Sequence, residues 1–287
     1  MSHDQQESAV PDRPENPRAA FDGEDRGTTR SIVIGPGLPP ADLAHARAYS
    51  WGWSAEAEAG AAQMADHGVV TGWLAEHPPK LVVMDVDATF AQGESIDQLA
   101  ERAGSGEEVA RITERAMHGE IEFGQALAQR VGTLAGLPVE VLDDVRAEMQ
   151  LAPGARELVA AIHAAGGKVA LVSGGFIEIV ATLGEAAGVD FVAANSLAVT
   201  DGRLTGRTVG PIVDRAAKAA WLLDFCEQVG CTADQAVAIG DGANDLDMMA
   251  VAGLGIAYNA KPAAASKADA TISFPRLDAA QGYLHLV

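Results

Sequence analysis

Short apolar runs alternate along this chain with longer stretches in which apolar residues recur every three or four positions. The first clear run is Leu81–Met84, and the acidic residues Asp85 and Asp87 follow it at once. A run this short, with consecutive Val residues, is typical of a strand buried on both faces of a parallel sheet. Similar runs follow at 168–172, 191–194, 236–239, 254–257 and 271–273. With helical patterns between them, these runs predict an α/β fold built on a parallel sheet.

A helical block separates the first two of these strands. Apolar residues recur at helical spacing in four segments, 94–103, 107–117, 122–134 and 139–149. Gly104, Gly119 and Gly136 separate them, as expected of helix ends. Four short helices are more than a simple crossover between two strands requires. We therefore predict a small helical cap, at about residues 94–150, inserted after the first core strand and covering the end of the sheet.

The part of the chain before the first core strand has a different composition. Residues 1–30 are rich in Asp, Glu, Arg, Pro and Gly and are predicted to be a disordered tail. Residues 31–78 are predicted to be a small N-terminal extension with a strand at 31–34 and helices at 41–47 and 56–67. The sequence indicates no role for this extension. The main domain is assigned to residues 79–287.

Charge and cysteine content limit the partners. The 40 acidic residues against 20 basic ones give a formal net charge of −20, which argues against nucleic acid and anionic membranes. A phosphorylated substrate would therefore need a local cation or metal. Cys226 and Cys231 form a lone C-x₄-C pair, a poor zinc signal, so we expect free thiols in a reducing cytoplasm. We find no signal peptide and no apolar run of membrane-spanning length.

Polar side chains gather just after three of the predicted strands. Because parallel strands end at the same edge of a sheet, these residues are expected to converge on one crevice. Carboxylate oxygens suit Mg²⁺, glycine amides can face an anion, and a lysine can neutralise a phosphate. A carboxylate beside Mg²⁺ can also attack phosphorus, while a second one moves protons. The residues at the strand ends are Asp85, Asp87, Ser173, Gly174, Gly175, Asp241, Asn244 and Asp245, and the candidate cation is Lys218, on a helix predicted at 214–229.

Each of these signals also has a simpler interpretation. The carboxylate pair could be an acidic turn, Ser173-Gly-Gly175 an ordinary loop, and Lys218 a solvated helix residue. Gly240-Asp-Gly-Ala-Asn-Asp245 uses residues that plain turns and calcium loops also use. Their order along the chain, and their common position at strand ends, make chance a poor explanation for the whole set.

The same segments resemble the phosphoserine phosphatases of the haloacid dehalogenase superfamily. The matching motifs, in order, are Asp85-Val-Asp-Ala-Thr89, Ser173-Gly-Gly175, Lys218 and Gly240-Asp-Gly-Ala-Asn-Asp245. Gly93-Glu94 and the segment that begins at Phe123 and includes Arg130 are similar to the family as well. The resemblance covers about residues 80–287 and implies a Rossmann-like parallel core with an inserted helical cap.

The resemblance also implies a role for each residue. Asp85 would be the nucleophile and Asp87 the proton donor and acceptor. Mg²⁺ would be held by Asp85, Asp241 and the main-chain carbonyl of Asp87. The phosphate would be bound by Ser173, Gly174 and Lys218. Glu94 would bind the substrate ammonium and Arg130 its carboxylate, with Met117 and Phe123 lining the pocket. Asn244 and Asp245 would orient the site, Asp245 by holding Lys218. Thr89 and Gly175 would support these residues.

The expected reaction is Mg²⁺-dependent hydrolysis of O-phospho-L-serine through an aspartyl-phosphate, the last step of L-serine synthesis. Another small phosphomonoester, or phosphoryl transfer to an alcohol, is the first alternative. A receiver-like module that stores phosphate on Asp85 is the second, and the cap and Asp87 argue against it. Ala88 and Phe90 replace residues common in the family, Ser and Leu, and are expected to affect rate, not reaction type. The sequence leaves monomer and homodimer both open.

Overall fold

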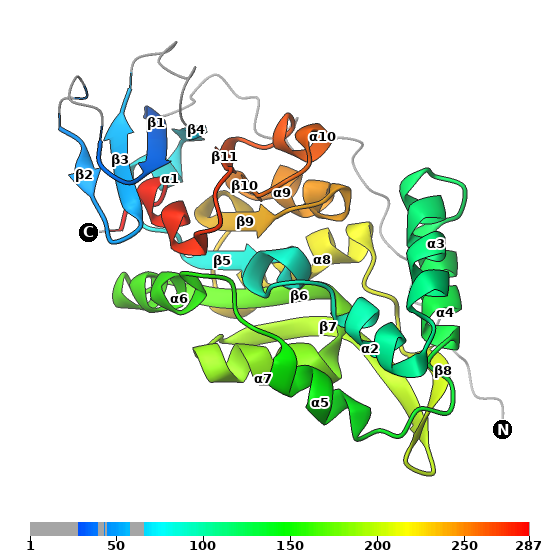
Figure 1. The fold of residues 1–287 in the computed structure, drawn as a ribbon. Helices are drawn as coiled ribbons and strands as arrows, with labels where there is room; N and C mark the ends of the chain where they lie inside the picture. Colours follow the sequence, from blue (N-terminus) through cyan, green and yellow to red (C-terminus); the bar gives the residue numbers. More distant parts are fainter. Residues whose placement is uncertain (1–27, 40–42, 44, 58–65, 287) are drawn as a thin grey trace, which may run out of the picture.

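The computed structural model describes residues 28–39, 43, 45–57 and 66–286. Within them, strands form a single eleven-stranded sheet in the order β2-β3-β1-β4-β11-β10-β9-β5-β6-β7-β8 (Figure 1). The strands are β1 (Thr29–Pro36), β2 (Arg47–Ala48), β3 (Gly52–Glu56), β4 (Asp66–Thr71), β5 (Leu81–Met84), β6 (Lys168–Phe176), β7 (Phe191–Thr200), β8 (Arg203–Val209), β9 (Ala236–Gly240), β10 (Leu254–Tyr258) and β11 (Ala270–Ile272).

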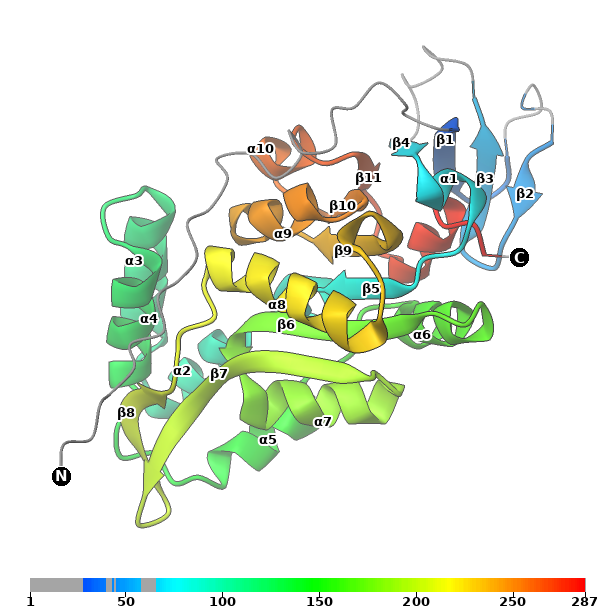
Figure 2. The same ribbon diagram turned by 180° about the vertical axis from the view of Figure 1, so that it is seen from behind.

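The six strands from β11 to β7 run parallel, and β5 lies among them between β9 and β6. All four residues of β5 are completely buried. Val82 and Met84 pack into the apolar layer under α6 and α7, whereas Leu81 and Val83 pack under α8 and α9 on the other face (Figures 1 and 2). A strand covered on both faces needs an uninterrupted apolar run. The predicted α/β fold with a parallel core is confirmed.

Helices cover both faces of this sheet. They are α1 (Trp73–Glu76), α2 (Ser95–Ala103), α3 (Gly106–Met117), α4 (Phe123–Gly132), α5 (Val141–Glu148), α6 (Ala155–Ala164), α7 (Ile177–Ala187), α8 (Arg215–Val229), α9 (Leu246–Val251) and α10 (Pro262–Ala265). In the described part of the chain no helix is both long enough and apolar enough to cross a bilayer.

The predicted cap is present as α2 to α5, between β5 and β6. Helices α3 and α4 stand side by side beyond the end of the sheet (Figure 1). The loop after α4 is tied to β8, because the Gly136 amide donates to the Leu204 carbonyl at 2.8 Å. Helix α5 lies against α7 instead, where Arg146 Nε donates to the Glu178 carbonyl at 2.6 Å. The cap is therefore anchored to the core at two places.

The described part of the N-terminal extension is made of strands. β1 pairs antiparallel with β3 and β4, and Gly68 of β4 pairs with Ala270 of β11, which joins the extension to the core sheet. The helices expected at 41–47 and 56–67 are wrong where they can be examined: Arg47 lies in β2, Glu56 in β3 and Asp66 in β4. These segments take their hydrogen bonds from distant strands, which a local helical period does not reveal.

The predicted tail at 1–30 lies almost wholly outside the described residues. Its last residues, Thr29 and Arg30, already pair with β4 and so belong to the sheet. β7 and β8 pair antiparallel as a hairpin whose turn is Asp201-Gly202. Both turn residues have positive φ, 50° and 71°, as a tight two-residue hairpin turn requires.

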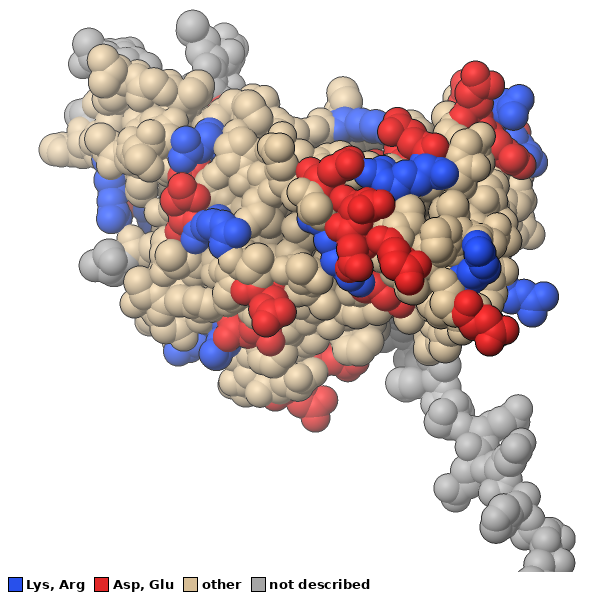
Figure 3. Space-filling model, turned by 60° about the horizontal axis from the view of Figure 1, so that its bottom comes forward, with Lys and Arg blue, Asp and Glu red and all other residues tan. Residues whose placement is uncertain are grey.

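The acidic excess of the chain is spread over a mixed surface. On the face shown in Figure 3, acidic and basic side chains lie next to one another and no broad basic area is visible. Several of the acids are paired, for example Glu148 with Arg102 at 2.6 Å.

Candidate active site

Asp85 stands where the central strand ends. Its amide donates to the Ile239 carbonyl of β9 at 2.9 Å, so the backbone is still held by the sheet at this residue. The chain then makes one wide turn, Val86–Phe90, in which Ala88 adopts a left-handed conformation with φ 57°. The Asp85 side chain accepts a hydrogen bond from the Val86 amide at 2.8 Å. Sheet and turn together fix the carboxylate at the carboxyl edge.

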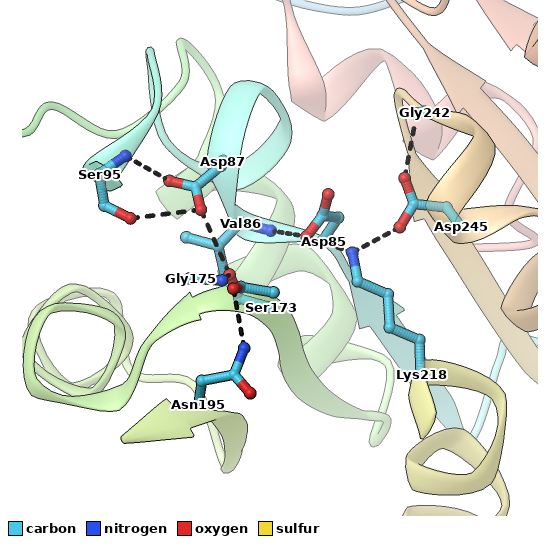
Figure 4. A network of polar contacts seen from close by, with 11 residues as sticks. Asp85, Val86, Asp87, Ser95, Ser173, Gly175, Asn195, Lys218, Gly242 and Asp245 are labelled. Atoms are coloured by element: carbon cyan, nitrogen blue, oxygen red, sulfur yellow. Dashed lines mark hydrogen bonds and ion pairs between the residues drawn. The ribbon is translucent and has the colours of Figure 1, made fainter. Parts of the chain in front are cut away.

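Lys218 reaches the same point from α8. Its Nζ lies 2.6 Å from Asp85 Oδ1 and 2.7 Å from Asp245 Oδ1, and the side chain is only 1% exposed (Figure 4). Burial alone would lower the pKa of Lys218, but the two carboxylates outweigh it and raise the pKa above its ordinary value. The ammonium is therefore charged. Asp245 holds Lys218, as the resemblance implied.

Asp87 points to the other side of the strand end (Figure 4). Its Oδ1 accepts from the Ser95 amide at 2.9 Å, and its Oδ2 lies 3.4 Å from the hydroxyls of Ser95 and Ser173. Burial raises the pKa of Asp87 and outweighs the opposing hydrogen bonds from Ser95. A carboxyl with a raised pKa can hold a proton and release it, which is what a general acid must do.

The Ser173–Gly175 segment lies against these two aspartates. The Gly175 amide donates to Ser173 Oγ at 2.8 Å. A β-carbon on Gly175 would come within 2.6 Å of Asp87 Oδ2, so any side chain here would have to displace the Asp87 carboxylate. Asn195 of β7 holds the loop from behind: its amide nitrogen donates to the Gly174 carbonyl at 2.8 Å and its oxygen accepts from the Val213 amide at 2.8 Å.

A group of three carboxylates marks the metal side of the site. Oxygens of Asp85, Asp241 and Asp245 all lie within 4.8 Å of one another. Both Asp245 oxygens already accept hydrogen bonds, from Lys218 and from the Gly242 amide. Asp85 and Asp241 are thus the carboxylates best placed to hold a cation, and their hard oxygens suit Mg²⁺. Burial, and then Asp245, raise the pKa of Asp241 to about 6.

Of the predicted Mg²⁺ ligands, the side chains of Asp85 and Asp241 lie together in this group. The Asp87 carboxylate is not in the group of three, because it is turned toward Ser95. A role for its main-chain carbonyl stays a prediction. The Thr89 hydroxyl is buried and has no hydrogen-bond partner within the described residues.

A cavity of about 660 Å³ opens between the strand ends and the cap. Arg130, whose Nε is buried with no partner in the described chain, is part of its cap-side wall. Glu94 lies on the same wall, where burial of its carboxylate, and then the charge of Asp87, raise its pKa to about 7. The predicted residues that line this cavity are Asp85, Asp87, Glu94, Met117, Phe123, Arg130, Gly174, Gly175, Asp241 and Asn244.

Residues 82–250 match the family model of haloacid dehalogenase-like hydrolases. The chain belongs to this family. It is 53% identical over 205 residues to phosphoserine phosphatase SerB2 of Mycobacterium tuberculosis, an alignment that covers 71% of this chain and 50% of that protein. A phosphoserine phosphatase of Streptococcus thermophilus is 51% identical over 197 residues, which make up 69% of this chain and 92% of that relative.

Solved structures agree with this assignment. A substrate-bound phosphoserine phosphatase complex superposes with a TM-score of 0.69 at 38% identity, covering 73% of this chain and 100% of the other. The chain spans only about half the length of the Mycobacterium tuberculosis relative but nearly all of the Streptococcus one. The haloacid dehalogenase-like fold with a cap after the first core strand, predicted from the sequence, is thereby confirmed.

The structure adds site residues to this haloacid dehalogenase-like hydrolase that sequence reasoning missed. Ser95 and Asn195 hold Asp87 and Gly174 in place. Asp97 and Lys261 line the cavity. A signal existed for two of them. Asn195 is a polar residue inside an otherwise buried strand pattern, where an amide needs specific partners. Lys261 follows the end of β10, the same position that identified the other motifs.

Proposed function

We propose that this chain is a Mg²⁺-dependent phosphatase that hydrolyses O-phospho-L-serine to L-serine and phosphate. The observation that carries the proposal is the pair Glu94 and Arg130 on the wall of the cavity whose floor holds Asp85. A zwitterionic amino acid needs a binding partner of each charge. Among the described residues, neither Glu94 nor Arg130 forms a salt bridge.

The reaction would begin at Asp85. Its carboxylate attacks phosphorus, the bond from phosphorus to the serine oxygen breaks, and an acyl phosphate forms on Asp85. Asp87 gives its proton to the departing serine oxygen. It then takes a proton from the water that cleaves the acyl phosphate. The raised pKa of Asp87 suits the first of these steps.

Charge at the phosphate would be balanced by groups already in place. Lys218 is held between Asp85 and Asp245 and carries a permanent positive charge beside the attacking oxygen. Ser173 and the backbone of Gly174 supply donors to the phosphate oxygens. When bound by Asp85 and Asp241, Mg²⁺ would neutralise charge that builds up on the phosphoryl group.

Substrate choice would come from the cap. The planar guanidinium of Arg130 can bind both oxygens of a carboxylate, and Glu94 can bind an ammonium. Phe123 packs over the phosphate loop, since a β-carbon on Gly174 would lie 3.2 Å from its ring. Met117 lines the same wall. We place the enzyme in the cytoplasm, where a reducing environment keeps Cys226 and Cys231 free, as they are in the structure.

The test is release of phosphate from O-phosphoserine with Mg²⁺ by wild type, Asp85→Asn and Asp143→Asn. Asp143 is a surface carboxylate of α5 outside the cavity, so its variant is the matched control for loss of one charge. We expect many turnovers for wild type and the control, and essentially none for Asp85→Asn. Stoichiometric phosphate release by wild type would indicate a phosphate-storing module. Turnover of other phosphomonoesters, but not of phosphoserine, would refute the substrate assignment.

A further inference from the structure

Lys261 lies where the parallel core meets the cap. It follows β10 and is the residue just before α10, whose first helical residue is Pro262. Asn259 turns the chain here with a left-handed φ of 45°. The Lys261 side chain is exposed, lines the active-site cavity and brings its Nζ to 3.7 Å from Met117 Sδ on cap helix α3. One flexible cation therefore bridges the two halves of the cavity rim.

The cavity is otherwise short of positive charge. Five carboxylates line it, whereas Arg130 and Lys261 are the cations among its lining residues; the acids are Asp85, Asp87, Glu94, Asp97 and Asp241. Lys218 is not among the lining residues and is held between two aspartates. A substrate with a dianionic phosphate would meet a predominantly negative entrance on a chain with a net charge of −20. Such repulsion slows the encounter unless a local cation offsets it.

Structural needs do not explain Lys261. A thioether sulfur is a weak acceptor, so the contact with Met117 contributes little. No ion pair of Lys261 is recorded within the described residues. Lys261 and Asp241 line the same cavity, so the charge of Lys261 acts within the site. The ammonium is thus available, close to the metal side and free to move.

We propose that Lys261 is a substrate-guiding residue that attracts the anionic phosphate into the cavity and holds it at the rim between the cap and Asp241. This inference rests on the proposed phosphatase function and adds a binding role to it. Lys261 acts before the chemical step, because the buried Lys218 balances the charge of the reacting phosphate. Exposed charges are screened by salt, so the contribution of Lys261 should depend on ionic strength.

Three variants test this role against wild type. Lys261→Gln removes the charge, Lys261→Arg keeps it, and Lys267→Gln removes a charge from an exposed lysine just after α10 that does not line the cavity. At low ionic strength we expect Lys261→Gln to lower kcat/KM for phosphoserine by about tenfold, the lower end of electrostatic steering effects, with kcat little changed. Lys261→Arg and Lys267→Gln should stay close to wild type, and the deficit should shrink in high salt.

A second readout separates guidance from damage to the metal site. Lys261 and a bound Mg²⁺ would be like charges in one cavity, so Lys261→Gln should bind Mg²⁺ at least as tightly as wild type. Three results would overturn the proposal: unchanged kcat/KM at low salt, a loss in kcat that salt does not alter, or an equal loss in Lys267→Gln. Titration with inorganic phosphate needs no turnover. If the protein is inactive on phosphoserine but binds phosphate in a way that depends on Lys261, the proposed substrate is refuted and the guiding role is retained.

Discussion

Replacing Arg130 by alanine should remove the preference for phosphoserine while leaving the chemistry intact. Arg130 lies on cap helix α4, away from Asp85, Lys218 and the three-carboxylate group. Its Nε is buried and unpaired within the described chain. Burial lowers the pKa of Arg130, yet a guanidinium remains charged at neutral pH. An unpaired buried donor on a permanent cation can bind a carboxylate, which is the role proposed for Arg130.

The size of the effect follows from this burial. Truncating one partner of a buried, hydrogen-bonded charge pair costs about 2–5 kcal/mol. Arg130 is partly exposed, so solvent screens its charge and the upper end of that range does not apply. We expect a loss of about 2–4 kcal/mol of transition-state stabilisation, or about 30- to 900-fold in kcat/KM for phosphoserine.

The assay compares two substrates in the same preparation. Phosphoserine offers a carboxylate, whereas p-nitrophenyl phosphate does not, so kcat/KM for the second should change little in Arg130→Ala. Arg111→Ala is the matched control, because Arg111 is an exposed arginine of α3 outside the cavity. Arg130→Lys should recover only part of the loss, since lysine cannot form a two-point contact. Equal losses on both substrates would contradict the reasoning and make Arg130 a support of the fold or of the phosphate site.

The remaining predictions concern charge, metal and loop geometry. The Glu94 pKa of about 7 means that the carboxyl is protonated below that pH and cannot pair with an ammonium. The kcat/KM of wild type for phosphoserine should therefore fall as the pH drops below 7, whereas Glu94→Gln should not show this fall. Chelation should abolish turnover and Mg²⁺ restore it, whereas Ca²⁺ should inhibit, because its larger shell tolerates bidentate carboxylates; full activity in excess chelator would exclude the metal. Gly175→Ala should lower kcat by about 100-fold through displacement of Asp87, with the protein still folded; near-normal kcat would show that the loop tolerates a side chain.

Residues at the strand ends could be predicted because two simple rules apply to them. A run such as Leu81–Met84, buried on both faces, must be apolar throughout, and parallel strands end at one edge. Asp85, Asp87 and Asp241 each follow such a run and do line one cavity. The cap was predictable for a similar reason: four helical periods cannot fit a single crossover between adjacent strands.

The strands of the N-terminal extension show where local patterns stop being informative. β1 finds its partners in β3 and β4, and β4 pairs with the core strand β11 where Gly68 faces Ala270. A β-carbon on Gly68 would lie 2.5 Å from the Ala270 side chain, so the glycine allows the strands of the extension to join the core sheet. Nothing in the spacing of residues 31–78 specifies that contact, because it depends on a strand 200 positions away.

Lys218 illustrates the same limit within the site. Its local sequence is that of any solvated helix residue, and its surroundings come from Asp85 and Asp245, which are distant in the chain. Two carboxylates beside a third, Asp241, repel one another in a buried place, and one lysine does not balance them. The proposed metal ion would complete this balance of charge. Lys261 stands at the rim of the same negative cavity, so one deficit of positive charge supports both proposals, a metal ion inside the site and a guiding cation at its entrance.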